Sequence, residues 1–363
     1  MLAELCDRCI RGIPFLSRWY FGKAAKIKRG YCLWMYRLGL LRPFSFVEWL
    51  VTYQCNFSCP YCEASAGKAA PNELNTEEGK ALIDELCKTG VERLLLSGGE
   101  PLMRPDVIEL MRYATQKKLS LGLVTNGYFV EKLWPQLKNF SYFLYFTSID
   151  GMPAYHDKLR AAGSFESAMK GLELFKTLKV PTRMVNTVVH PKNLDQLEGL
   201  LGLLKKSGAN VWHLTPAVAV GRAAQDKGFT LNGAELKRLV EFITKNRKVM
   251  RIGLGEARAY LACFSENPLD KPFFCGAGLT RCNIMPDGEV LPCQQVYDNA
   301  FSEGNVRTTP FSKIWKKGFK KIRERVLRDE CQGCIYLDAC QGGCWAEMVK
   351  QGACLKAVWE KSD

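Results

Sequence analysis

The run Cys55-Asn-Phe-Ser-Cys59-Pro-Tyr-Cys62 places three thiols within eight residues and decides how this chain is interpreted. It follows an apolar stretch, 46–53, which is typical of a buried strand. Three thiolates at that spacing can wrap a single iron–sulfur cube, and a cube has four irons. One iron would then lack a protein ligand, so the spacing predicts a position where an exogenous molecule can bind and react.

Cysteine is unusually common in this chain of 363 residues, which holds 16 cysteines and only three histidines, His156, His190 and His213. The N-terminus lacks the layout of a signal peptide, and no run reaches the ~18 apolar residues that a membrane span needs. We therefore expect a cytoplasmic protein whose cysteines bind metal instead of forming disulfides. Thiolate-rich sites favour iron–sulfur clusters or four-thiolate zinc.

Positive charge is concentrated at the start of the chain. The formal net charge is +14, and residues 1–42 contain nine Lys/Arg but only two Asp/Glu, interleaved with aromatic residues. Such an extension can pack on the main domain as a solvated helix, or it can contact an anionic membrane surface or an acidic partner. Both interpretations stay open, and no nucleic acid is expected as a partner.

Strand and helix patterns alternate after this extension. The predicted strands are 46–53, 93–97, 120–125, 143–149, 182–189 and 211–215. The predicted helices are 76–87, 105–117, 130–137, 165–178 and 194–206. Six βα units at this spacing predict an α/β fold with a parallel sheet, a partial (β/α)6 TIM-like barrel.

Several turns with polar residues or glycine fall where the predicted strands end. They are the Cys55–Cys62 run, Gly98-Gly99-Glu100-Pro101, Thr125-Asn126-Gly127 and Ser148-Ile149-Asp150-Gly151. Because the carboxyl ends of parallel strands meet at one face, we expect these turns to form one shared site.

The composition changes from about Cys275 onward, where cysteines become dense and short strands are separated by Gly, Pro and Gln. A region this small and rich in loops is expected to need metal clusters to fold. We therefore divide the chain into an extension (1–45), a barrel (46–250) and a linker with a cysteine-rich domain (251–363).

The three cysteines, the aromatic Tyr61 between them and the GGEP turn after the next strand together resemble the radical S-adenosylmethionine (SAM) enzymes, over roughly residues 46–250. The resemblance implies that SAM chelates the open iron and is cleaved reductively to a 5′-deoxyadenosyl radical. That radical would abstract hydrogen from a substrate, so the resemblance implies an oxidoreductase with Cys55, Cys59 and Cys62 as its catalytic cluster ligands. An electron donor such as flavodoxin or ferredoxin is implied as well.

The resemblance also assigns contacts with SAM. The implied residues are Tyr61, Gly98, Gly99, Glu100, Asn126, Ser148, Asp150 and Arg160. In this scheme the glycines let backbone approach the methionine moiety, and Glu100 balances the SAM ammonium. Ser148 or Asp150 would contact the ribose or the carboxylate, which Arg160 would also grip.

Most of these residues have a structural alternative. Glu100 can cap a tight turn, Arg160 can form a surface ion pair, and Tyr61 can fill a gap beside the cluster. Asn126, and Asn186 as a weaker candidate, can satisfy loop backbone.

The cysteine pattern from Cys275 onward resembles the SPASM extension of the same family, which holds two auxiliary clusters. By resemblance, the cluster nearer the barrel would be held by Cys275, Cys282, Cys293 and Cys344. The outer cluster would be held by Cys331, Cys334, Cys340 and Cys354. Structural zinc is the alternative, since C-x2-C pairs also occur in zinc ribbons, and Cys282 can be unligated. Three 4Fe–4S clusters are therefore expected in all.

The substrate is less constrained than the cofactors. Sulfatase-maturing relatives have an acidic base after the cysteine equivalent to Cys293, where this chain has Gln294, and an amide cannot accept a proton at neutral pH. The 45 residues before the barrel are too few for the usual leader-peptide recognition domain. Three alternatives remain: oxidative modification or crosslinking of a peptide or protein, radical modification of a small or lipid-like metabolite at a membrane surface, and a non-catalytic iron–sulfur protein. Cys6, Cys9, Cys32, Cys87 and Cys263 are interpreted as ordinary cysteines.

Overall fold

One sheet runs through the described chain in the order β7-β6-β5-β4-β3-β2-β1-β8-β9. The computed structural model describes residues 14–43, 46–255, 275–293, 295–296, 299–346 and 354; Cys6, Cys9, Cys263 and Gln294 lie outside them. The strands are β1 (Phe46–Leu50), β2 (Arg93–Ser97), β3 (Ser120–Val124), β4 (Tyr142–Ser148), β5 (Thr182–Val189), β6 (Val211–Pro216), β7 (Ile252–Leu254), β8 (Arg281–Ile284) and β9 (Val290–Leu291). Strands β1 to β7 pair in parallel with their neighbours in sequence, which confirms the parallel α/β fold expected from alternating elements.

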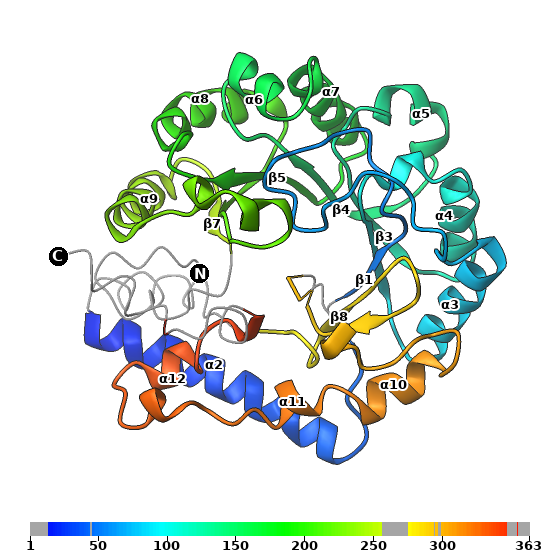
Figure 1. Cartoon of the computed structure of the whole chain (residues 1–363), viewed down its shortest axis with the longest axis vertical. Coiled ribbons are helices and arrows are strands. Elements are labelled where there is room, and N and C mark those ends of the chain that lie inside the picture. The colour runs from blue at the N-terminus through cyan, green and yellow to red at the C-terminus, as the bar shows by residue number, and fades with distance from the viewer. Residues whose placement is uncertain are drawn as a thin grey trace.

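Helices cover the outside of this curved sheet (Figure 1). They are α3 (Thr76–Lys88), α4 (Val107–Gln116), α5 (Val130–Leu137), α6 (Pro153–Leu159), α7 (Ser164–Thr177), α8 (Leu197–Ser207) and α9 (Gly233–Asn246). The ring is left open between β7 and β9, and the long helix α2 (Pro14–Arg37) crosses below that opening. The partial barrel predicted from the sequence is therefore confirmed.

Local sequence explains where these elements begin and why they pack. Helix α3 starts at a capping box, in which Asn75 accepts from the Glu78 amide while the Glu78 carboxylate accepts from the Asn75 amide. Strands β1 to β3 are mostly apolar and buried, as is usual where a sheet is covered on both faces, whereas β4 to β6 tend to alternate between buried and half-buried residues. Trp49, Leu96 and Leu123 of three neighbouring strands are almost fully buried in one core.

The predicted boundaries differ from the observed ones by a few residues. Strand β1 ends at Leu50 and not at residue 53, and the helix predicted at 194–206 begins as a 3-10 turn, Leu194–Gln196, before α8. Helices α6 and α9 and strand β7 were not predicted. Helix α6 is only seven residues long, and the three residues of β7 are too few to form a recognisable pattern.

The cysteine-rich part of the chain is joined to the barrel sheet. Strand β8 pairs in parallel with β1, with Cys282 opposite Val47, and β9 pairs antiparallel with β8. The buried Glu48 carboxylate accepts from Ser97 Oγ (2.6 Å) and Asn283 Nδ2 (2.9 Å), which links β2, β1 and β8. The predicted boundary at residue 250 therefore divides the sequence but not the sheet, because β1 to β6 before it and β7 to β9 after it belong to one sheet.

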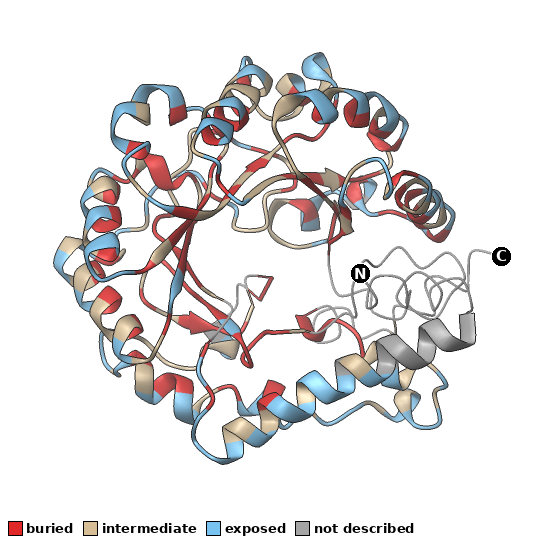
Figure 2. Ribbon diagram, turned by 180° about the vertical axis from the view of Figure 1, so that it is seen from behind, coloured by how far each residue is buried: buried red, intermediate tan, exposed pale blue. Residues whose placement is uncertain are grey.

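Helix α2 lies against the C-terminal elements α11 (Lys320–Arg323) and α12 (Leu337–Cys340). Arg29 Nη2 donates to the carbonyl of Ile322 (3.1 Å), and Lys26 pairs with Asp338 (3.2 Å). Figure 2 shows the described part of α2 mostly exposed or half-buried, in contrast to the buried strands inside the ring. Among the described residues no helix is long and apolar enough to cross a membrane.

Candidate active site

The loop with Cys55, Cys59 and Cys62 begins just after β1 and closes on itself at its base. The Cys55 amide donates to the carbonyl of Gly67 (2.9 Å), and the Gly67 amide donates to the carbonyl of Tyr53 (2.9 Å). Within the loop the Cys62 amide donates to the carbonyl of Cys59 (3.2 Å). These backbone bonds fix the cysteine loop at the carboxyl end of β1.

The three thiols share an apolar surrounding. Cys59 is buried, Cys55 and Cys62 are half-buried, and all three are free and pack around Phe57 and Phe229. Burial, with the neighbouring charges of Glu100 and the other two cysteines, raises the pKa of the Cys55 thiol to about 11 although the Phe57 amide counteracts it. The thiols are therefore close enough to influence each other, and a metal must displace their protons on binding.

The donor set of this loop suits an iron–sulfur cluster. Thiolates are the protein ligands that such clusters use, and each thiolate of a cube binds a different iron. Three free thiols on one closed loop, in an apolar shell, match that requirement.

A second loop, which follows β6, clamps the cysteine loop. Arg222 donates from Nε to the carbonyl of Cys59 (2.7 Å), from Nη1 to that of Ala66 (2.8 Å) and from its amide to that of Cys62 (3.1 Å). Gly221 has φ +58°, and a Cβ there would lie 2.3 Å from the carbonyl oxygens of Cys62 and Glu63. Neither residue was predicted from the sequence, because nothing near Gly221 in the sequence indicates which loop it contacts.

The GGEP turn packs tightly on the chain just before the cysteines. The Gly99 amide donates to the carbonyl of Thr52 (2.8 Å) and the Glu100 amide to that of Gln54 (2.7 Å). A Cβ on Gly98 would lie 2.4 Å from the carbonyl oxygen of Thr52, and one on Gly99 2.3 Å from that of Gln54. Close approach of this chain's own backbone therefore already requires both glycines.

Glu100 is fully buried and holds the turn after β3. Its carboxylate accepts from the Leu102 amide (3.1 Å), from Thr125 Oγ1 (2.8 Å) and from the Asn126 amide (2.8 Å). Burial raises its pKa to about 7, although these three donors counteract that rise. The structure thus shows the capping role that the sequence left as the alternative for Glu100.

Asn126 connects this turn to the cysteine loop. Its Nδ2 donates to Asn56 Oδ1 (2.8 Å), and its Oδ1 accepts from the Tyr128 amide (3.0 Å). Asn186, the weaker candidate, accepts from Thr215 Oγ1 (2.7 Å) and pairs across the sheet with Ser148 at the end of β4. Both asparagines therefore serve loops or strands at the carboxyl end of the sheet.

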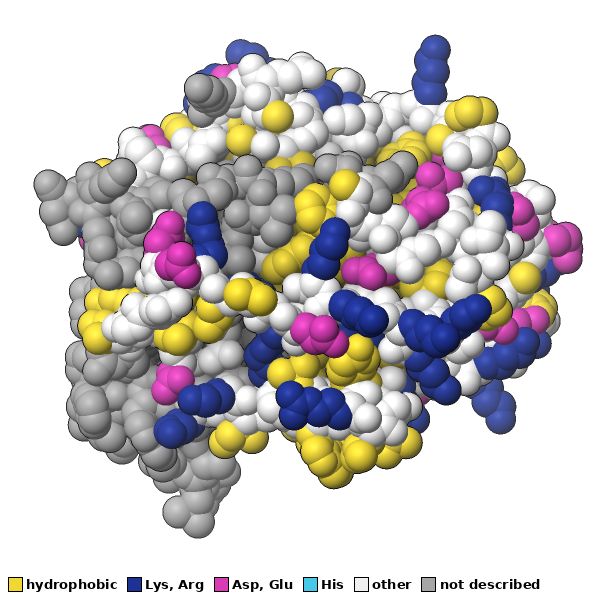
Figure 3. Space-filling view, turned by 60° about the horizontal axis from the view of Figure 1, so that its bottom comes forward, with side chains coloured by type: hydrophobic (Ala, Val, Ile, Leu, Met, Phe, Trp, Pro, Cys, Tyr) yellow, Lys and Arg dark blue, Asp and Glu magenta, His cyan; other side chains and the backbone are white. Residues whose placement is uncertain are grey.

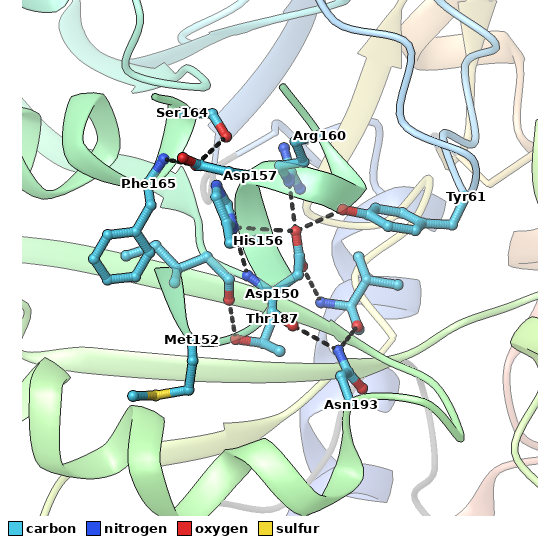
Figure 4. A network of polar contacts seen from close by, with 12 residues as sticks. Tyr61, Asp150, Met152, His156, Asp157, Arg160, Ser164, Phe165, Thr187 and Asn193 are labelled. Atoms are coloured by element: carbon cyan, nitrogen blue, oxygen red, sulfur yellow. Dashed lines mark hydrogen bonds and ion pairs between the residues drawn. The ribbon is translucent and has the colours of Figure 1, made fainter. Parts of the chain in front are cut away.

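Asp150 is the centre of a buried polar network (Figure 4). One carboxylate oxygen accepts from Tyr61 Oη (2.5 Å) and from Arg160 Nε, and the other accepts from the Val188 amide (2.8 Å). Burial alone would raise the pKa of Asp150, but the Arg160 guanidinium and its other donors hold that pKa below its ordinary value. Asp150 therefore positions Tyr61 and Arg160, and its carboxylate is already occupied by protein donors.

Arg160 is a largely buried residue and not part of a surface ion pair. Its side chain is only 10% exposed, and its guanidinium lies 5.6 Å from the centre of the Tyr61 ring. It is near enough to Cys59 that its charge counteracts the rise in the pKa of that thiol caused by burial. This location, near the Cys59 thiol and the Tyr61 ring, is compatible with the predicted grip on a carboxylate.

His190 is another residue of this site that the sequence analysis missed. It directly follows β5, is fully buried, and its ring lies 4.9 Å from that of Phe229 and 6.3 Å from that of Tyr61. Neither ring nitrogen has a hydrogen-bond partner in the described part of the chain. The signal in the sequence was its position directly after the fifth strand, where the other site residues also follow strands. A single histidine at such a position was easy to overlook.

The C-terminal cysteines lie on short elements and on the loops between them. None of the eight is in a disulfide: Cys275, Cys282, Cys293, Cys331, Cys334, Cys340, Cys344 and Cys354. Cys282 is fully buried in β8, whereas Cys331 and Cys334 lie in and after a 3-10 turn, Asp329–Cys331. Burial lowers the pKa of Arg325, and the charges of Cys275, Cys340 and Cys331 counteract this, so one guanidinium lies near thiols from both predicted ligand sets.

Comparison with known proteins agrees with this geometry. A model of the radical SAM superfamily matches residues 49–204, and a model of the SPASM iron–sulfur cluster-binding domain matches residues 275–335. The mycofactocin maturase MftC of Mycobacterium ulcerans is 32% identical over 83% of this chain and 82% of its own length. The chain belongs to the radical SAM superfamily.

Two further relatives differ in what their names describe. The AdoMet-dependent heme synthase of Oleidesulfovibrio alaskensis is 32% identical over 83% of this chain and 82% of its own length. SuiB of Streptococcus suis, solved with S-adenosylmethionine and with its precursor peptide SuiA, shares the fold with TM-scores of 0.68 and 0.69, at 19% and 18% identity. These matches cover 85% and 86% of this chain and 75% of SuiB. This protein is thus a radical SAM enzyme with a 4Fe–4S cluster, SAM and SPASM auxiliary clusters.

Proposed function

We propose that this radical SAM enzyme oxidatively modifies or crosslinks a peptide or protein. The observation that carries the proposal is one chain that combines the closed three-thiol loop with eight further cysteines that form no disulfide, and that matches a maturase over 83% of the chain. When bound, the cluster and SAM would supply a 5′-deoxyadenosyl radical that abstracts hydrogen from the substrate. The protein supplies position and exclusion of water.

We assign the protein's part of this reaction to residues around the carboxyl ends of the strands. Cys55, Cys59 and Cys62 are proposed as ligands of the SAM-binding cluster, held by Arg222 and the GGEP turn. Arg160 is proposed to bind the SAM carboxylate while Asp150 keeps the guanidinium and Tyr61 in place. Ser148, Gly98, Gly99, Glu100 and Asn126 are proposed to shape the remainder of the SAM pocket.

We further propose two complete auxiliary clusters, with the ligand sets given by the family pattern. The anaerobically reconstituted protein is then expected to hold about twelve irons in three four-iron clusters. A content near four irons with bound zinc would contradict this assignment. A cytoplasmic location and an electron donor such as flavodoxin or ferredoxin belong to the same proposal.

A small-molecule substrate is the second candidate. It is favoured by the heme synthase of Oleidesulfovibrio alaskensis, which matches this chain at the same 32% identity as the maturase. The substrate would then be a tetrapyrrole or a similar metabolite. The two candidate functions share the cluster and the SAM pocket, and they differ only in the substrate from which the radical abstracts hydrogen.

Mass spectrometry distinguishes the two candidates. The reconstituted protein is incubated anaerobically with SAM, a reductant and peptides encoded near its gene, and in parallel with iron–coproporphyrin. Release of 5′-deoxyadenosine tests the enzyme itself. A peptide that becomes about 2 Da lighter supports the first candidate, whereas unchanged peptides and a converted porphyrin would establish the second.

A further inference from the structure

Helix α2 has two apolar faces, and among the residues that the structure describes only one of them packs against the protein. Ile27, Tyr31, Trp34 and Leu38 are 70%, 54%, 56% and 52% exposed. Their spacing of four, three and four residues places them in one stripe along the helix. Large apolar side chains on a stable surface usually occur singly, so a continuous stripe marks an interaction surface.

The opposite face of α2 is already occupied by the C-terminal part of the chain. Cys32 is fully buried, and the Arg323 guanidinium lies 4.6 Å from the centre of the Tyr36 ring. Arg29 donates to the carbonyl of Ile322 (3.1 Å). The exposed stripe is therefore not needed to attach the helix to its own protein.

Further apolar side chains are exposed on the neighbouring C-terminal elements. Val326, Leu327 and Ile335 are 88%, 38% and 67% exposed, and they flank α11 and α12, which pack beside α2. With Leu40, these residues and the α2 stripe make up eight of the eleven exposed large hydrophobic residues in the described part of the chain. We name this surface, formed by α2, α10 (Phe311–Lys317), α11 and residues 324–340, the α2 face.

Positive charge surrounds these apolar residues. The sequence of α2 contains six Lys/Arg, that of 311–323 contains six more, and neither contains Asp or Glu. Trp315 Nε1 of α10 donates to the carbonyl of Leu41 (2.8 Å), which keeps the two basic segments together. Figure 3 shows Lys and Arg side chains gathered around hydrophobic ones on the side of the molecule that carries these helices.

The exposed cations of both segments are Lys23, Lys26, Lys28, Arg37, Lys313, Lys316, Lys317, Lys320 and Lys321. Acidic residues are few here: Asp338 pairs with Lys26 (3.2 Å), and Glu324, Asp329 and Glu330 lie in the segment between α11 and α12. A second copy of the chain would bring the same nine cations into contact with each other. The occupant must therefore be anionic and must also accept apolar side chains.

We propose that the α2 face binds the surface of an anionic lipid bilayer, with α2 parallel to the membrane plane. Trp34 and Tyr31 suit the boundary between headgroups and acyl chains, and the flanking lysines suit anionic headgroups. Each Lys or Arg near such a surface contributes about 1 kcal/mol of binding, which is about a fivefold change in affinity. This inference does not depend on the substrate and goes beyond the proposed function.

Vesicle co-sedimentation of the reconstituted full chain tests the proposal. The vesicles contain either phosphatidylcholine alone or phosphatidylcholine with phosphatidylglycerol. We expect binding only to the anionic vesicles, and we expect it to weaken as salt is added. Trp34→Glu with Leu38→Glu, and separately Lys316→Glu with Lys317→Glu, should each weaken binding at least tenfold.

Matched controls are present in the same chain. Val249 is 48% exposed on the turn after α9, so Val249→Glu introduces one such negative charge at a similarly exposed apolar position away from the α2 face. Lys205 and Lys206 form an exposed pair in the last turn of α8, as Lys316 and Lys317 do in α10, so their reversal to Glu controls for net charge. Both controls should retain binding.

The proposal is overturned by equal binding to both kinds of vesicle, or by equal loss in the α2-face variants and the controls. It is also overturned if light scattering shows that the α2-face variants convert a dimer to a monomer, or if they abolish binding of an acidic peptide substrate in place of vesicle binding. Circular dichroism confirms that each variant is folded. Release of 5′-deoxyadenosine should be unchanged in all variants, so failure of this proposal is distinguishable from failure of the proposed function.

Discussion

The two cysteine regions of this enzyme are built differently. In the barrel, the three thiols sit on one loop that backbone bonds and a glycine–arginine clamp hold in place, and the nearby Arg160 is neutralised by Asp150. In the C-terminal region, Cys282, Cys331 and Cys340 lie on short elements and the other five thiols lie on loops. Arg29, Arg323 and Arg325 lie near thiols of this region and donate to backbone carbonyls.

Charge explains the difference. A cube bound by four thiolates carries one more negative charge than a cube bound by three, and a buried charge must be compensated. In the proposed assignment, the three thiols of the barrel leave one iron for SAM, whereas the C-terminal region supplies cations for clusters that protein thiolates alone complete. The two regions therefore respond to different substitutions.

The largest effect is expected from removing the barrel thiols. Replacing Cys55, Cys59 and Cys62 together with Ala should abolish SAM cleavage but leave roughly eight irons, because the auxiliary ligands are untouched. Iron analysis and release of 5′-deoxyadenosine measure the two outcomes. Cleavage that survived would show that the reactive cluster lies elsewhere.

The clamp on the cysteine loop gives the next largest effect. Gly221→Ala places a Cβ 2.3 Å from two backbone oxygens at φ +58°, so we expect a loss of about 2 kcal/mol of local stability and of iron from the barrel site. The iron content should fall from about twelve toward eight, and SAM cleavage should fall with it.

Gly163→Ala is the matched control for this clamp. Gly163 also has a positive φ, +74°, but a Cβ there has nothing within 4 Å. The Gly163→Ala protein should have the same unfavourable positive φ at an alanine but no clash, so it should keep its iron. Equal iron loss in both variants would mean that backbone conformation, and not contact with the cysteine loop, explains Gly221.

The arginines of the C-terminal region are tested by Arg323→Gln. Arg323 is 2% exposed, donates to the carbonyls of Gly278, Trp315 and Gly318, and lies near Cys282. Losing these charged bonds should cost roughly 2–4 kcal/mol in unfolding free energy. Losing the cation should lower the reduction potential of an auxiliary cluster, measured by redox titration with electron paramagnetic resonance.

Arg183 offers a control for the packing part of this effect. It donates to the carbonyls of Gly208 and Val180 (both 2.6 Å) at the other end of the barrel strands. Arg183→Gln should reduce stability without moving any cluster potential. If both substitutions moved the auxiliary potential equally, the charge argument for the C-terminal region would be wrong.

The sequence could predict what is encoded locally. The apolar runs located six of the strands, and the spacing of Cys55, Cys59 and Cys62 and the turns at Gly98 and Asp150 identified the family. What it could not predict depends on contacts between distant residues. Tyr61 donates to Asp150, which lies 89 residues later, and Arg222 donates to Cys59, which lies 163 residues earlier. Strand β8 pairs with β1 although the rest of the barrel lies between them in the sequence.

The same limit applies to the roles of individual residues. Glu100 and Asp150 were expected to face SAM, yet three protein donors occupy each carboxylate. A sequence shows that a carboxylate follows a strand, but only the folded chain shows which donors reach it first. The contacts assigned to Arg160 and Ser148 accordingly remain predictions.

The smallest predicted effect is on the pH dependence of the unfolding free energy. It distinguishes the two regions because all three histidines lie in the barrel. His156 is 1% exposed and accepts from the Asp150 amide at Nδ1 (3.0 Å). Burial, helped by Arg160, lowers its pKa from 6.5 to about 4. Because the folded pKa is the lower one, its contribution is complete above pH 6.5 and is lost as pH falls toward 4.

Between pH 7 and pH 5 this histidine should account for a loss of about 2 kcal/mol in the unfolding free energy. His156→Gln keeps an acceptor but cannot take up a proton, so its stability should fall less over that interval, as measured by urea unfolding at each pH. Lys158→Gln, at an exposed position of the same helix, should follow the unmodified protein. A His156→Gln protein with an unchanged pH dependence would mean that His156 does not contribute to the acid sensitivity of the fold.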